Sequence, residues 1–249
     1  MRANAHVADW TARLVARFSP DDVLRISQNV LAAIDEVSSQ RWDAATRRAD
    51  ALPGTIRPEK ITALTDSFSR ELGAAGAAAG AAAVAPTVGT AATLLATTAE
   101  LGWFTARAGD LILTIAALHG HPDPSVDERR AWVLAVLIYG SSARDGFARA
   151  INEASTGLSP VSNRRLSMTT LQTANRVMAR SLLRRYGSRR GIIAVGRALP
   201  VGIGAVIGGS ANYFAIRTLA RHADEFFARL PYSAIDVASV DVTGRQLPR

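Results

Sequence analysis

A run of 27 residues without a charged side chain, Gly73–Ala99, limits what this chain of 249 residues can fold into. The run consists mainly of Gly, Ala, Thr and Val, and Pro86 lies near its middle. Because proline interrupts helical hydrogen bonding, we expect Pro86 to divide the run into two helices or to kink one. A second uncharged stretch, Ala198–Ile216, has 19 residues and lies between Arg197 and Arg217.

Each uncharged stretch carries a pair of glycines four residues apart, Gly76 with Gly80 and Gly204 with Gly208. Residues four apart share one face of a helix, and glycine there lets a second backbone approach closely, as in a glycine zipper. The stretches therefore predict helical hairpins that are buried in a bundle, inserted partly into a membrane, or spanning it. The second stretch is close to the length that a bilayer requires, whereas its proline and Asn212 oppose a simple span.

Short motifs predict where several helices begin and end. Ser19-Pro20 supplies a capping hydroxyl and a proline suited to the first helical position. Ser125 and Glu128 have the spacing of a capping box, and Gly140 follows the next apolar run as a C-terminal cap. Apolar residues between Ser19 and the turn at Leu52–Gly54 recur at steps of three and four, which predicts one apolar helix face: Val23, Ile26, Val30, Ile34 and Val37.

These patterns predict an all-α fold, a single helical bundle with two Gly/Ala-rich apolar hairpin segments. We divide the chain into N-terminal helices (1–57), a helical core (58–230) and a C-terminal tail (231–249). The tail shows a short alternation of apolar residues, and we expect an irregular strap or a short strand there.

Charge is distributed unevenly along the chain, whose net charge is +8. Residues 1–153 carry 15 basic and 17 acidic side chains, whereas residues 154–249 carry 14 basic and 4 acidic ones. No acidic residue occurs between Glu153 and Asp224. Such a stretch attracts anions: phosphate-bearing lipids, nucleic acid or an acidic partner. The chain has no cysteine, which excludes disulfides and thiolate chemistry.

An arginine-rich helix is expected between Asn163 and Arg185, because arginines recur at four-residue steps with apolar residues beside them. It could lie on an anionic membrane, contact nucleic acid, or simply present a solvated face. The absence of interleaved aromatic residues disfavours nucleic acid. The candidate anion-binding residues are Arg176, Arg180, Arg184, Arg185, Arg189 and Arg190.

Charged and polar side chains also occur inside apolar segments. Arg107 and Asp110 are three residues apart and can form an ion pair on one helix face. Buried charges are costly unless paired, so ion-paired packing is one interpretation. The other is a polar site that Glu100, Asp110, Asn212 and Arg217 share, with Glu100, Arg107 and Asp110 as candidate catalytic residues.

His119 and His121 have a spacing that zinc sites use, but both lie in one proline-containing turn with only Asp123 nearby. We therefore predict no metal site. We also find no catalytic triad pattern, no phosphate-binding loop followed by lysine, and no zinc-protease motif, and we expect no cofactor.

Two motifs in order resemble the EcsC protein family. The first runs from Glu100 to Gly120 and continues, after a short linker, from Asp127 to Gly140; the second is Arg197–Asn212. The resemblance covers Pro58–Leu230. It implies an association with secretion and an ABC transporter, and it carries over no catalytic residue. We assign the matching positions to helix packing: Glu100, Asp110, Gly140, Pro200, Gly204, Gly208 and Asn212.

We expect a non-enzymatic, membrane-associated helper protein that docks through its arginine-rich helix on an anionic membrane or a membrane protein. Residues Met1–Trp10 contain no apolar signal-peptide region, so the expected location is cytoplasmic, at the inner face of the cell membrane. One alternative is a hydrolase of peptides or lipids with a carboxylate and arginine site between the hairpins. Another is a soluble protein-interaction module, which predicts an exposed apolar patch.

Overall fold

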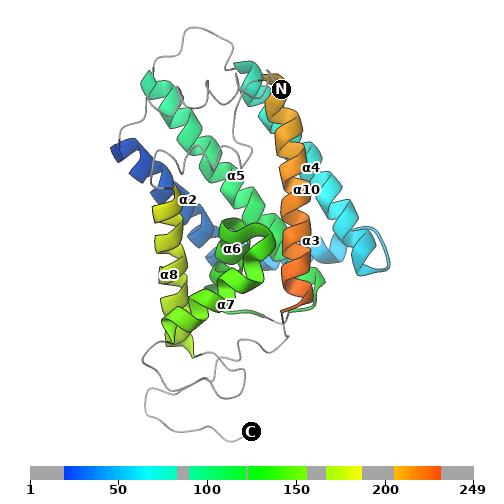
Figure 1. Ribbon diagram of the computed structural model, residues 1–249. Coiled ribbons are helices and arrows are strands. Elements are labelled where there is room, and N and C mark those ends of the chain that lie inside the picture. Colours follow the sequence, from blue (N-terminus) through cyan, green and yellow to red (C-terminus); the bar gives the residue numbers. More distant parts are fainter. Residues whose placement is uncertain (1–19, 83–89, 122, 156–166, 187–204, 231–249) are drawn as a thin grey trace, which may run out of the picture.

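The structure is a computed structural model that describes residues 20–82, 90–121, 123–155, 167–186 and 205–230 (Figure 1). Within these ranges the chain forms helices and turns and contains no strand, which confirms the all-α prediction. The predicted tail, 231–249, lies outside them, as do Pro86, Pro200 and Gly204. The helices are α2 (Pro20–Gln40), α3 (Trp42–Ala51), α4 (Arg57–Ala82), α5 (Thr90–Leu118), α6 (Val126–Tyr139), α7 (Ala143–Ala154), α8 (Met168–Tyr186) and α10 (Ala205–Ala228), with a 3-10 turn, η1 (Gly140–Ser142).

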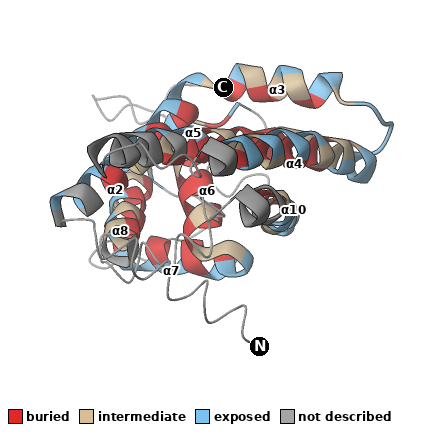
Figure 2. Cartoon of the chain, turned by 90° about the horizontal axis from the view of Figure 1, so that it is seen from above, coloured by how far each residue is buried: buried red, intermediate tan, exposed pale blue. Residues whose placement is uncertain are grey.

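The long helix α5 lies at the centre of the bundle. It contacts α2, α3, α4, α6 and α10, so its second half is enclosed on all sides (Figure 2). The residues from Leu111 to Ala116 are all buried. In the described part of the chain, one helical stretch, Leu101–Leu118, is long and apolar enough to cross a membrane. Most of that stretch is buried inside the bundle, which is also how a soluble core helix looks.

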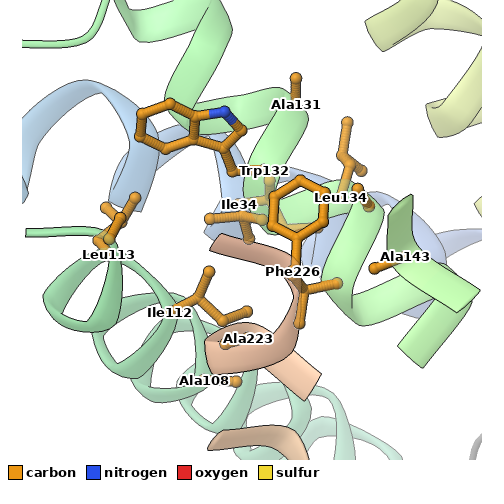
Figure 3. Packing of buried hydrophobic residues seen from close by; sticks show 14 of the residues in the cluster. Ile34, Ala108, Ile112, Leu113, Ala131, Trp132, Leu134, Ala143, Ala223 and Phe226 are labelled. Carbon is orange, nitrogen blue, oxygen red and sulfur yellow. The ribbon is translucent and has the colours of Figure 1, made fainter. Parts of the chain in front are cut away.

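Large side chains from several helices meet beside the second half of α5. Figure 3 shows Trp132 of α6, Phe226 of α10 and Ile112 of α5 packed together. The ring of Trp132 also contacts Trp42 and Phe227, with centroids 6.4 and 5.4 Å away. These edge-to-face contacts add to the burial of apolar area that stabilises the fold.

Several predicted helix ends are confirmed. Ser125 Oγ accepts the amide of Glu128, while the carboxylate of Glu128 accepts the amide of Ser125 at 2.6 Å, so the capping box of α6 is complete. Gly140 ends α6 with a φ of 55°, a conformation in which side chains are strained. Helix α2 begins at Pro20, and Ile26, Ile34 and Val37 of its predicted apolar face are buried.

Helices α4 and α10 run antiparallel and form the most extensive helix contact among the described elements (Figure 1). The side-chain amide of Asn212 on α10 donates to the carbonyl of Leu72 on α4 at 3.1 Å. Asn212 and Gly76 are both buried. The described parts of the two uncharged stretches therefore pack against each other. Gly80 and Gly208 lie on these helices, but their surroundings are outside the described part.

Candidate functional site

An ionic cluster joins α4, α5 and Arg41, the residue between α2 and α3. The side chain of Asp110 is only 2% exposed, and its Oδ2 accepts hydrogen bonds from Arg107 at 2.7 Å and Arg41 at 3.2 Å. Arg107 also donates from Nε to Glu71 Oε1 at 2.8 Å and lies over the ring of Phe68. The predicted pair of Arg107 and Asp110 is confirmed, and Arg41 and Glu71 extend it into a cluster.

The chemistry of this cluster is that of a structural ion pair. Burial opposes the charge on Arg107, but the hydrogen bonds and charges of Glu71 and Asp110 outweigh burial and raise the pKa of Arg107. A guanidinium held in this way neither gives up nor takes a proton near neutral pH. Glu100 lies on α5, about two turns from Arg107, and its side chain is outside the described part. The arrangement supports packing rather than hydrolysis.

The polar site that sequence analysis offered as an alternative divides into separate contacts. Arg217 forms an ion pair with Asp66 of α4 at 2.6 Å and also donates to the hydroxyl of Tyr213. The side-chain amide of Asn212 donates to the Leu72 carbonyl, and the carboxylate of Asp110 pairs with two arginines. These interactions hold helices together, and none of them joins Asn212, Arg217 and Asp110 to one another.

Helix α8 presents two arginines to solvent. Arg176 and Arg180 are exposed, while Leu171, Met178 and Leu182 on the other face are buried against the bundle. No acidic residue occurs on α8, so these charges lack a neutralising neighbour on their own helix. Arg184 and Arg185 belong to its last turns with side chains outside the described part, and Arg189 and Arg190 lie beyond it.

The histidine turn is a packing feature. His119 Nε2 lies 2.7 Å from Asp224 Oδ1 on α10, and burial lowers the pKa of His119 more than this hydrogen bond raises it. His121 packs against the rings of Trp132 and Phe227, and burial together with His119 lowers its pKa to about 4. Among the described residues, no three metal-ligating side chains gather around a common point.

Two exposed aromatic side chains escaped the sequence analysis. Trp103 on α5 is 42% exposed, and Phe214 on α10 is 66% exposed. Both are at or near the edge of an uncharged segment, but the spacing of residues along a helix does not show that these two side chains face outward. Their exposure is notable because large apolar side chains usually lie in the core of a soluble helical protein.

Compared with known proteins, the chain matches no family model, no curated protein and no solved structure. The resemblance to the EcsC family therefore stays a prediction. Three structural features bear on the function: the exposed arginines of α8, the packing of α4 against α10, and the exposed aromatic residues Trp103 and Phe214.

Proposed function

We propose that this protein is a non-enzymatic, membrane-associated helper of the EcsC type, peripheral at the inner face of the cell membrane. It docks on anionic lipid through the arginine face of α8, which we define as Arg176, Arg180, Arg184 and Arg185. The observation that carries the proposal is the exposure of Arg176 and Arg180 on a helix without acidic residues.

The physical basis is the attraction between this face and lipid phosphates. Each basic residue near an anionic bilayer contributes about 1 kcal/mol, and the attraction extends over roughly one Debye length. Two arginines on other helices are balanced by acids: Arg217 pairs with Asp66, and Arg130 pairs with Asp35 at 2.8 Å. Arg176 and Arg180 are exposed, so both can meet an external anion.

Lipid is favoured over nucleic acid because of what surrounds the arginines. No aromatic residue that could stack on bases lies among the described positions of α8 between Met168 and Leu183. In Figure 1, α8 rises toward the end of the bundle where α4 ends and α5 and α10 begin, which is the end with the uncharged helix segments. A membrane protein such as an ABC transporter is the partner that the family resemblance suggests at such a surface.

A catalytic role receives less support. Arg107 and Asp110, the candidate catalytic pair with described side chains, are bonded to each other and to Arg41 and Glu71. Their interactions account for the fold without a substrate, and the proposal requires no metal or cofactor.

Vesicle binding tests the proposal. The full chain should co-sediment with vesicles of phosphatidylglycerol and phosphatidylcholine and much less with phosphatidylcholine alone. Replacing Arg176 and Arg180 with glutamine removes about 2 kcal/mol of attraction, which weakens binding about thirtyfold. The matched control is Arg144→Gln with Arg149→Gln, which removes two exposed charges from α7, a helix that also carries Asp145 and Glu153.

The control variant should bind nearly as well as the wild type. Equal losses for both pairs of substitutions would contradict a specific role for α8. Binding to duplex DNA in preference to anionic vesicles would replace the membrane with nucleic acid as the partner. In cells, the protein should pellet with membranes, and washing with salt should release at least part of it.

A further inference from the structure

The histidines of the described part of the chain gather at one contact. The chain has four histidines, and the structure describes His119, His121 and His222. His119 and His121 lie in the turn that follows α5, and His222 lies on α10, whose packing neighbours include α5, α6 and η1. We infer that the contact of Ala223–Ala228 with α5, α6 and η1 is an acid-sensitive latch, which opens when its histidines take up protons. The latch requires no membrane and is independent of the docking proposed above.

His119 joins the end of α5 to the last turns of α10. Its side chain is 4% exposed, and its Nε2 lies 2.7 Å from Oδ1 of Asp224. Burial is the largest influence and lowers the pKa of His119, and the charge of Arg57 at the start of α4 lowers it further. The hydrogen bond and the charge of Asp224 raise the pKa of His119 without restoring it. The closed contact therefore favours the neutral ring.

His121 lies among aromatic rings at the same contact. Its ring centroid is 5.0 Å from that of Trp132 and 5.4 Å from that of Phe227. Burial first, and then the charge that His119 acquires, lower the pKa of His121 to about 4. A proton on His121 places a charge in an apolar setting, which is costly. The other charged residues of this turn and of the start of α6 are Asp123, Asp127, Glu128, Arg129 and Arg130.

His222 contacts the rest of the bundle from the side of α10. It is half-buried, and a Cβ added to Gly140 at the start of η1 would lie 3.2 Å from its Nδ1. Burial and the charge of Arg221 lower the pKa of His222, and the charge of Glu225 raises it less. All three described histidines thus hold a proton less readily in the closed contact than in water.

This common direction decides how acid acts on the latch. A group whose pKa is lower in the closed form than in the open form binds its proton preferentially in the open form, so proton uptake shifts the equilibrium toward opening. In the open form His121 regains its ordinary pKa of about 6.5. Lowering the pH from about 7.5 to about 5.5 then raises the ratio of open to closed forms about tenfold through His121 alone. His119 and His222 act in the same direction.

The last turns of α10 can open while the first part of the helix stays in place. The first part is held to α4 by the hydrogen bond of Asn212 and by the ion pair of Arg217 with Asp66. Opening of Ala223–Ala228 brings the buried rings of Phe226 and Phe227 to water, and it leaves the other helix contacts unbroken. Such a local opening requires less free energy than unfolding of the whole bundle.

Thiol labelling tests the latch in the full chain. The chain has no native cysteine, so Ala223→Cys places a single buried thiol at the latch, and Ala135→Cys places one at a buried position in the middle of α6 as the control. The reagent is 4,4′-dithiodipyridine, and each rate is divided by that of an unfolded peptide with the same cysteine, which removes the pH dependence of the thiol itself. Urea unfolding followed by circular dichroism gives the global stability of each variant.

The thiol at position 223 should react faster than global unfolding allows, and low urea should scarcely change its rate, because the opening exposes little surface. From about pH 7.5 to about 5.5 its corrected rate should rise at least about tenfold. The thiol at position 135 should react only as fast as global unfolding permits, with the full urea dependence of that transition.

Histidine substitutions show whether protons on these residues open the latch. His121→Phe keeps an aromatic ring, and His119→Gln and His222→Gln keep polar side chains without a titrating group. Each variant should remove part of the acid effect at position 223, and the three together should remove nearly all of it. Asp224→Asn should enlarge the effect, because the carboxylate supports the charged form of His119 in the closed contact.

Two outcomes would overturn the latch. One is a thiol at position 223 that follows global unfolding in urea, as the thiol at position 135 does, because acid then weakens the whole bundle. The other is a full acid effect that survives each single histidine substitution. Since every measurement is made without lipid, failure of the latch leaves the docking proposal standing, and failure of vesicle binding leaves the latch standing.

Discussion

Helices α5 and α10 run between two ends of the bundle that are built by different means. At the end that we call the aromatic end, His119, His121, Trp132, Phe226 and Phe227 interlock through ring contacts and a hydrogen bond to Asp224. At the opposite end, which contains Gly73–Ala82 of α4 and Ala205–Ala211 of α10, the sequence has no charged residue and is rich in glycine and alanine, and the side chain of Asn212 donates a hydrogen bond to the backbone carbonyl of Leu72. Large side chains specify one partner, whereas small ones allow close contact with whatever lies next to them, including lipid.

Removing the side chain of Trp132 is the strongest test of the difference between the two ends. Its side chain is buried among Trp42, His121 and Phe227, so Trp132→Ala should lower the free energy of unfolding by about 3–5 kcal/mol. Urea unfolding followed by circular dichroism measures the loss. Trp103→Ala removes an exposed tryptophan of α5 as the matched control and should change stability by less than about 1 kcal/mol. Similar losses for both would mean that the two ends do not differ in this way.

Two glycines on α5 test the same difference through smaller changes in the free energy of unfolding. A Cβ added to Gly109 would lie 2.8 Å from a methyl carbon of the buried Val37, so Gly109→Ala should destabilise by about 1–3 kcal/mol. Gly102, seven residues nearer the start of α5, has nothing within 4 Å of an added Cβ. Gly102→Ala should therefore stabilise by up to about 1 kcal/mol through helix propensity. Thermal or urea unfolding of both variants decides whether the signs differ.

Acid should affect the aromatic end through His121. Its pKa is about 4 in the folded protein and near 6.5 as a reference, so the unfolded chain binds the proton first as pH falls. Stability is therefore fully present above pH 6.5 and is lost between pH 6.5 and 4, at most by about 1.4 kcal/mol per pH unit from this residue. His121→Phe should flatten the dependence in urea titrations. An unchanged slope would assign the effect to other groups, such as His119, whose pKa is also lowered.

The local features of the fold could be predicted from the sequence, because they depend on spacing. The capping box of Ser125 and Glu128, the start of α2 at Pro20, and the pair of Arg107 and Asp110 follow from residues at most four apart. In each case both partners lie in one helical turn or at one helix end.

Distant partners could not be predicted in the same way. Asp110 also binds Arg41, 69 residues earlier, and His119 binds Asp224, 105 residues later. Helical periodicity tells which face a residue occupies but not which helix packs against that face. The exposure of Phe214 could not be predicted either, because it depends on which face of α10 the other helices cover. That face contains Asn212 and Ile216, which are buried two residues before and after Phe214.

The contact between α4 and α10 has a consequence for synthesis of the protein. Leu72 and Asn212 are 140 residues apart in the chain, and Asp66 and Arg217 are 151 apart. At 5–20 residues per second, a ribosome needs roughly 7–30 seconds to deliver α10 after α4. During that interval the side of α4 that α10 will cover stays open, so the nascent chain offers chaperones or the bilayer itself a binding surface that the finished molecule hides.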